Sequence, residues 1–316
     1  VMQIVINGAL PGPAIARELI KHLPQKAPAL IQLLTQGTGT LSVRDPATDL
    51  CTPAQSWLLQ AHGFTGDQAQ HLIAGLARLV LRQLKQIHSV APDQPVWLAE
   101  LVHIAPSREG AMLIPADQLA LSESYSRALL QAIAPYLDDT GFQFEYLSPE
   151  WWRVTPPADF TVQAASTELV SQSNLNNWWT QDVQTRPWRR LINEFQMLAF
   201  ALPDNRQREQ AGLPSVNSLW LFGGASCQQL GREPGNLHLV DDLHDSLIRQ
   251  DWGLWLEQLA QLDRTLLAPL LTGPMPELVL TGLDRYAHVG PAARRIWPFS
   301  LFKQHSNWSQ WWSPLS

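Results

Sequence analysis

Apolar and polar positions along the chain repeat with two periods, one typical of buried strands and the other typical of helices. Residues 4–6 form a short β-branched run followed by an Asn-Gly pair, which predicts a buried strand and a turn. Two helical patterns follow, over residues 13–22 and 28–35, and Gly37 is expected to end the second. The chain therefore opens as a strand followed by helices.

The next segment carries a clear helix start. Thr52 and Gln55 have the spacing of a capping box, with proline at the first helical position, and this predicts a helix that runs to about His62. Asp67 is expected to open a second, amphipathic helix. One face of that helix would carry Leu72, Leu76, Leu79, Val80 and Leu84.

The pattern changes near residue 93. We expect strands over 96–104, 112–114 and 142–147, a helix over 122–137, and a polar loop over 162–185. Residues 93–185 are accordingly predicted to form a small inserted α+β subdomain.

After this segment, strand and helix patterns alternate again. Helical spacing resumes at residue 187, an apolar strand covers 216–222, Asp251 opens the clearest helix of the chain, and 277–281 has the pattern of a buried strand. Such alternation is typical of an α/β fold with a three-layer arrangement, in which helices cover both faces of a mainly parallel sheet. We expect residues 1–92 and 186–316 to form this core.

Composition and charge exclude several classes of function. The chain has 316 residues, of which 45% are apolar and 16% charged, so one large core can form without disulfides. A formal net charge of -6 argues against a nucleic-acid partner. Two cysteines provide neither a disulfide framework nor a metal quartet, and no apolar run is long enough to span a membrane. We expect a cytoplasmic protein with no signal peptide and no membrane partner.

Three pairs of stretches resemble the archaeal-type cofactor-independent phosphoglycerate mutases of the alkaline phosphatase superfamily. They are residues 4–8 with 27–37, residues 202–206 with 212–224, and residues 278–282 with 297–299. The chain also resembles a bacterial group described as phosphoglycerate-mutase-related or RpfE-type regulatory proteins. The resemblance implies an alkaline-phosphatase-like core, and it implies that residues 93–185 are the cap subdomain of the family.

The same resemblance implies a chemistry that this sequence does not fully support. Relatives use a Ser or Thr nucleophile between two divalent metals, which are held by about six Asp and His ligands. Asn7 stands where the family has the aspartate of the first strand. The nucleophile position falls on Ala54, with Thr52 nearby, and Thr52 is also explained as a helix cap.

The remaining ligand positions are also changed. An acidic segment that contains Asp241, His244 and Asp245 precedes the last long helix, where it could bind one metal or form a solvated turn, and we favour the turn. Asp284 and Arg285 stand near the family's Asp-His pair. We therefore expect no cofactor, with Mn, Zn or Mg as the alternative.

Arginines offer another way to bind a ligand. Arg206, Arg285 and Arg294 lie in or beside the family-like stretches and, with Asn7, could bind a small phosphorylated or carboxylate ligand without metal. Surface salt bridges are the simpler interpretation of these arginines.

Three functions follow from these observations. The first is a non-catalytic homologue of the mutases that acts as a binding or regulatory protein. The alternative is an active metal-dependent mutase or phosphomonoesterase with a rearranged site around Asn7, Thr52, His244 and Asp284. A third is a carbohydrate or peptide module lined by some of the fourteen tryptophans, although their scatter along the chain favours core packing.

Overall fold

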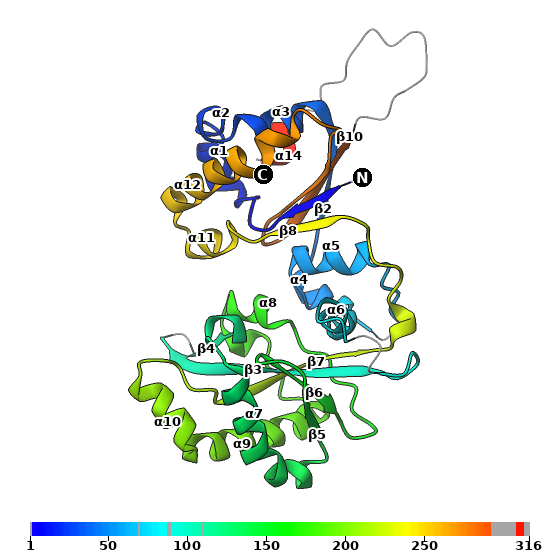
Figure 1. The fold of residues 1–316 in the computed structure, drawn as a ribbon, viewed down its shortest axis with the longest axis vertical. Helices are drawn as coiled ribbons and strands as arrows, with labels where there is room; N and C mark the ends of the chain where they lie inside the picture. Colours follow the sequence, from blue (N-terminus) through cyan, green and yellow to red (C-terminus); the bar gives the residue numbers. More distant parts are fainter. Residues whose placement is uncertain (1, 69, 87–89, 109, 292–307, 313–316) are drawn as a thin grey trace. The chain divides into compact units, whose positions relative to one another are not determined.

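The computed structural model describes residues 2–68, 70–86, 90–108, 110–291 and 308–312 (Figure 1). The chain divides into two compact units. The first unit contains the residues up to Asp45 together with those from Glu233 onward, and the second unit contains Pro46–Arg232. Arg294 and the stretch 297–299 of the sequence analysis lie outside the described residues.

The first unit is built on a five-stranded mixed sheet with the order β2-β10-β9-β1-β8. Its strands are β1 (Gln3–Ile6), β2 (Gly37–Val43), β8 (Leu237–Val240), β9 (Glu277–Thr281) and β10 (Arg285–Pro291). Strand β1 pairs in parallel with β8 and β9, whereas β10 is antiparallel to both β9 and β2. The sheet is therefore not mainly parallel as expected, because the short connection 282–284 makes β9 and β10 a hairpin.

Helices of the first unit gather beside this sheet (Figure 1). They are α1 (Pro13–Leu19), α2 (Leu23–Lys26), α3 (Pro28–Gln36), α11 (His244–Arg249), α12 (Trp252–Leu262), α13 (Ala268–Leu270) and α14 (Trp308–Trp312). A π-helical turn, Asp263–Leu267, joins α12 to α13. The buried Asp263 carboxylate accepts hydrogen bonds from the N–H groups of Ala29 (3.2 Å) and Leu30 (2.7 Å), and so satisfies the N-terminus of α3.

The second unit contains an antiparallel sheet. Its strands are β3 (Val96–Ser107), β4 (Gly110–Ile114), β5 (Gln143–Tyr146), β6 (Trp151–Thr155) and β7 (Ser218–Ala225). The long strand β3 pairs with β7, β6 and β4. The helices are α4 (Pro46–Asp49), α5 (Pro53–Ala61), α6 (Leu76–Gln83), α7 (Glu123–Leu137), α8 (Thr167–Ser171), α9 (Arg186–Ala201) and α10 (Pro203–Gln210).

Side-chain alternation along β3 gives the second unit two cores. Val96 and Leu98 pack in one cluster with residues of α5 and α6, while Trp97, Ala99 and Leu101 pack in another with residues of α7 and α9. Helices therefore cover both faces of this sheet (Figure 1). Where β7 meets the start of β3, Gly223 has a φ of +123°, and a Cβ there would lie 2.3 Å from the carbonyl oxygen of Val96.

Many local expectations are confirmed by these elements. Strands form over β1, β3, β5, β7 and β9, helices form over α1, α3, α7, α9 and α12, and the capping box opens α5. The helix expected from Asp67 begins only at Leu76, after a 3-10 turn at Leu72–Gly75. Strands β2, β6, β8 and β10 were not expected.

The division of the chain also differs from the predicted one. Residues 93–185 belong to the same compact unit as residues 46–92 and 186–232. This follows from pairing, because β7 adds to the sheet directly beside β3, and α5 and α6 cover one of its faces. Among the described residues, no helix is both long enough and apolar enough to cross a membrane.

Candidate functional site

Three polar side chains meet at the carboxyl ends of the parallel strands of the first unit. Asn7 follows β1, Asp241 follows β8, and Thr281 ends β9. The register of the sheet explains their meeting, because Ile6 lies opposite Val240 on one side and Leu280 on the other. Ligands of open α/β sheets usually bind at such strand ends, so we call these three residues the strand-end cluster.

Hydrogen bonds join the members of the strand-end cluster to one another. The Thr281 hydroxyl donates to Asn7 Oδ1 at 2.8 Å, and Asn7 Nδ2 donates to Asp241 Oδ1 at 3.2 Å. The N–H of Gly8 also donates to Thr281 Oγ1, at 3.4 Å. Thr281 is fully buried, Asn7 is nearly so, and Asp241 is exposed. The amide of Asn7 therefore donates one hydrogen bond and accepts one within the strand-end cluster.

The turn after β1 is held tightly against α11 and α12. Gly8 has a φ of +80°, and a Cβ there would lie 2.8 Å from the backbone of Leu243 and His244. The Trp255 indole donates to the carbonyl oxygen of Gly8 at 2.9 Å. The Asn-Gly pair is thus fixed by packing, and the position of Asn7 at the end of β1 is fixed with it.

The strand-end cluster does not fit the two-metal centre that the family resemblance implies. Its donor set is one carboxylate, one neutral amide and one hydroxyl. Paired divalent cations need several carboxylates or imidazoles. Within the described parts of the chain, no group of three or more His, Cys, Asp or Glu side chains is placed to hold one ion.

Other predicted ligands of the first unit have separate surroundings. His244 is the half-buried first residue of α11, while Asp245 is exposed and lies 3.9 Å from the Arg249 guanidinium. Asp284 lies in the 282–284 connection and accepts a hydrogen bond from the Arg285 guanidinium at 2.8 Å. These three side chains do not come together as the ligands of one metal ion.

The side chain of Arg285 stabilises the fold of the first unit. Its side chain is 3% exposed, and Nη2 donates to the carbonyl oxygen of Pro11 at 2.7 Å. With Nη1 on Asp284, the guanidinium ties the start of β10 to the loop after β1. Arg206, by contrast, is exposed on α10 of the second unit. The arginines of the predicted anion site therefore belong to different units.

Thr52 is the N-cap of α5 in the second unit. Its hydroxyl accepts from the N–H of Gln55 at 3.3 Å, and the Gln55 side chain accepts from the N–H of Thr52 at 3.1 Å. The hydroxyl also donates to Glu168 Oε1 at 3.2 Å, and the residue is 3% exposed. These contacts describe a buried helix cap, and the capping role expected from the sequence is confirmed.

Sequence reasoning did not single out Glu100, which lies in the middle of β3 and is buried. Its carboxylate accepts from the N–H of Ala116 (2.9 Å), the Thr167 hydroxyl (2.7 Å) and the Trp151 indole (3.4 Å). Burial raises the pKa of the Glu100 carboxyl to about 7, because desolvation outweighs the three hydrogen bonds that favour the charged form. A single glutamate inside the apolar run 96–104 is the sequence signal that could have identified it.

No protein-family model matches the chain, and no curated protein matches it. Among solved structures, it is similar to a cofactor-independent phosphoglycerate mutase from Thermoplasma acidophilum DSM 1728, with 13% identity, a TM-score of 0.37, and coverage of 92% of this chain and 89% of that chain. It is also similar to the PH0037 protein from Pyrococcus horikoshii, with 11% identity, a TM-score of 0.41, and coverage of 91% and 86%.

Proposed function

We propose that this chain is a binding or regulatory protein and does not catalyse two-metal phosphoryl transfer. One observation supports the proposal: at the strand ends, where an α/β sheet usually places its ligand, a neutral amide, Asn7, is hydrogen-bonded to Thr281 and to Asp241. Two neighbouring exposed carboxylates, Asp241 and Asp242, remain there, and these are too few hard ligands for a pair of divalent cations.

Thr52 gives the competing enzyme hypothesis no support. A nucleophilic hydroxyl needs a base to accept its proton and an open approach for substrate. The Thr52 hydroxyl has a carboxylate partner in Glu168, but it is 3% exposed and also accepts the N–H of Gln55. Helix capping accounts for the conformation of this side chain.

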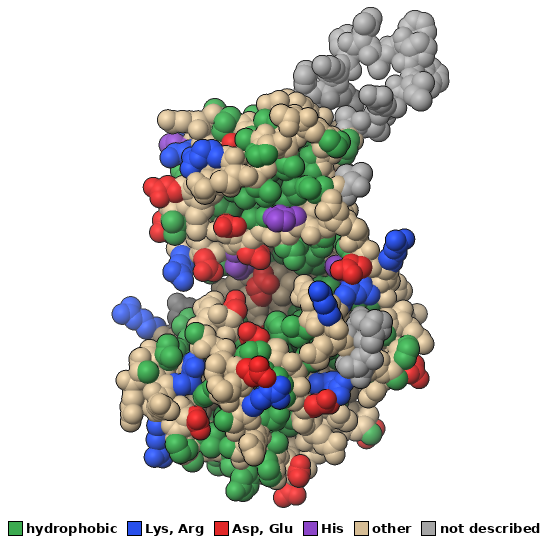
Figure 2. All heavy atoms as spheres, in the orientation of Figure 1, with side chains coloured by type: hydrophobic (Ala, Val, Ile, Leu, Met, Phe, Trp, Pro, Cys, Tyr) green, Lys and Arg blue, Asp and Glu red, His purple; other side chains and the backbone are tan. Residues whose placement is uncertain are grey.

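Charge guides the choice of ligand. Asp241 and Asp242 are adjacent and exposed at the strand ends, where they would repel an anion. A small anionic ligand therefore stays a prediction for the exposed Arg206. Nucleic acid is not proposed, because the net charge is -6 and the described Lys and Arg side chains are scattered over the face drawn in Figure 2.

The proposal is tested by metal content and turnover together. The full chain is incubated with Mn, Zn or Mg, freed of excess metal and submitted to elemental analysis, and its turnover of phosphoglycerate and of p-nitrophenyl phosphate is measured. We expect less than one ion per chain and no turnover above buffer. Two ions per chain, with turnover that is lost in Thr52→Ala and kept in the matched Thr52→Ser, would overturn the proposal.

A further inference from the structure

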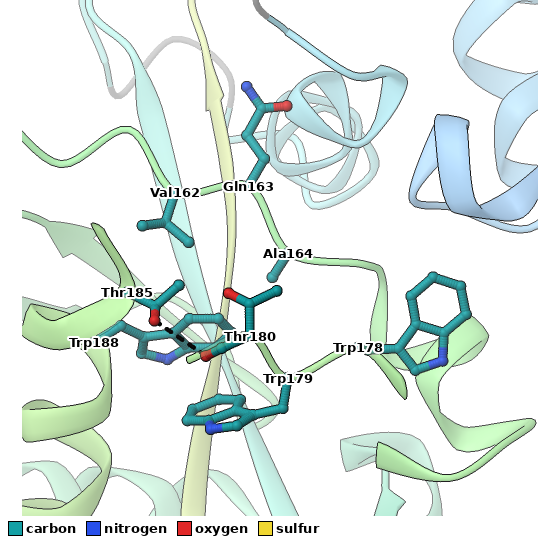
Figure 3. Close-up of a pocket in the computed structure, with 8 residues that line it drawn as sticks. All are labelled: Val162, Gln163, Ala164, Trp178, Trp179, Thr180, Thr185 and Trp188. Carbon is teal, nitrogen blue, oxygen red and sulfur yellow. Dashed lines mark hydrogen bonds between the residues drawn. The ribbon is translucent and has the colours of Figure 1, made fainter. Parts of the chain in front are cut away.

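Helix α9 of the second unit is held firmly by one face. This face packs against α7 and β7. Its buried residues are Trp188, Leu191, Ile192, Phe195 and Ala199. The ring centroids of Trp188 and Trp179 are 4.8 Å apart, and the space beside these rings has room for only about one water molecule (Figure 3). The tryptophans at this end of α9 are therefore core residues, and the helix is a rigid support for whatever its other face presents.

The opposite face of α9 is an exposed ridge. Its positions are 186, 190, 193, 197 and 200, and steps of three or four residues place them on one side of an α-helix. Two arginines, Arg186 and Arg190, occupy the N-terminal half, and Asn193 lies in the middle. Met197 and Phe200 occupy the C-terminal half. We call these five residues the α9 ridge.

The C-terminal half of the α9 ridge exposes apolar surface to solvent. Phe200 is 83% exposed, and Met197, one turn earlier, is 64% exposed. Isolated apolar side chains are common on protein surfaces, whereas neighbouring large ones form a patch of the kind that a partner covers. The arginines of the other half have no ion-pair partner among the described residues. Both halves of the ridge can therefore gain contacts from a partner.

The α9 ridge is complementary to itself when two copies of the helix lie antiparallel. Arg190 and Phe200 each lie five residues from position 195, which is about 7.5 Å along the helix axis. A two-fold axis beside position 195 therefore places Arg190 level with Phe200 of the partner subunit. A guanidinium that lies over an aromatic ring is attracted by it. The same axis places Asn193 level with Met197 of the partner subunit.

Charges at the two ends of the ridge match in the same arrangement. Arg186 lies at the N-terminal end of the ridge, nine residues before position 195. Asp204, nine residues after position 195, is exposed in the first turn of α10, just beyond the end of α9. An antiparallel pair brings each Arg186 to the end that carries Asp204 of the partner subunit. A parallel pair would instead bring the arginines of the two copies together, and like charges repel.

We infer that the α9 ridge is the contact surface of a symmetric homodimer, in which α9 packs antiparallel against α9 of a second copy. Two-fold symmetry makes each of these pairings occur twice. One helix from each copy gives a small interface, so we expect a weak, reversible dimer with a Kd of about 10 to 100 μM. The inference goes beyond the proposed function and does not depend on the strand-end cluster.

Sedimentation equilibrium of the full chain tests the dimer at concentrations from about 5 μM to about 500 μM. We expect the average mass to rise from that of one chain toward that of two. Phe200→Gln removes the ring from both halves of the interface and should weaken association by about tenfold or more. Met112→Gln, an exposed apolar change on β4, is the matched control and should associate like the wild type. A wild type that stays monomeric throughout, or equal association in Phe200→Gln, would overturn the inference.

A charge exchange tests the antiparallel pairing itself. Arg186→Asp and Asp204→Arg each place like charges opposite one another in the homodimer, so each variant alone should associate more weakly than the wild type. A mixture of the two variants forms dimers in which both pairings are again between opposite charges. We expect this mixture to associate about as strongly as the wild type. If it associates no better than either variant alone, or if both variants alone associate like the wild type, the pairing is wrong.

Discussion

Glu100 should make the stability of this protein depend on pH. Its carboxyl lies in the middle strand of the second unit, and burial raises its pKa from 4.5 to about 7. The folded protein therefore binds this proton more tightly than the unfolded chain does. The sign follows from linkage: the stabilising contribution is complete below pH 4.5 and is lost as the pH rises through 7.

The size of the effect follows from the same shift. Each pKa unit corresponds to about 1.4 kcal/mol, so the loss between pH 5 and pH 8 amounts to about 2.5 kcal/mol. Glu100→Gln removes the titration and keeps an acceptor oxygen for the Ala116 N–H. Its amide group can donate to the Thr167 hydroxyl, which can rotate to accept.

Urea unfolding at a series of pH values measures this contribution. The free energy of unfolding is determined from pH 5 to pH 8 for the wild type and for Glu100→Gln, with Glu209→Gln, an exposed change on α10, as the control. We expect the wild type to lose about 2.5 kcal/mol relative to Glu100→Gln over this range, while the control follows the wild type. A constant difference between wild type and Glu100→Gln would show that the carboxyl does not titrate as the buried site requires.

Three other substitutions test the contacts described above by urea unfolding. Thr52→Ala should lower the free energy of unfolding by about 1 kcal/mol through loss of the α5 cap, and Thr52→Ser should restore most of it; no loss would contradict the capping role. Asn7→Asp should lower the free energy of unfolding by about 1–2 kcal/mol, because it replaces the amide donor with a second carboxylate beside Asp241. An unchanged free energy of unfolding would exclude the hydrogen bond between Asn7 and Asp241. Asp263→Ala should lower the free energy of unfolding by about 2–3 kcal/mol, because it leaves two N–H groups of α3 without an acceptor, and Asp263→Asn should lower it less. Equal losses in the two variants would show that the charge of Asp263, and not its acceptor oxygens, stabilises α3.

The candidate sites were only partly visible in the sequence. Asn7 could be placed at the end of β1, because an apolar run and the following Asn-Gly pair lie side by side in the chain. Its partners could not be identified, since Asp241 and Thr281 reach it only through the pairing of β1 with β8 and β9. Arg285 stands beside a family-like stretch, but its burial against Pro11 depends on the β9–β10 hairpin.

What the sequence determined by itself is local. The spacing of Thr52 and Gln55 defined a cap, and the periods of apolar residues located most helices and strands, because these features depend on neighbours within a few residues. The tertiary structure decided the strand pairings, the division into two units and the burial of Glu100. Each of these depends on segments far apart in the chain, and a local pattern of residues does not specify which distant segment will pack against it.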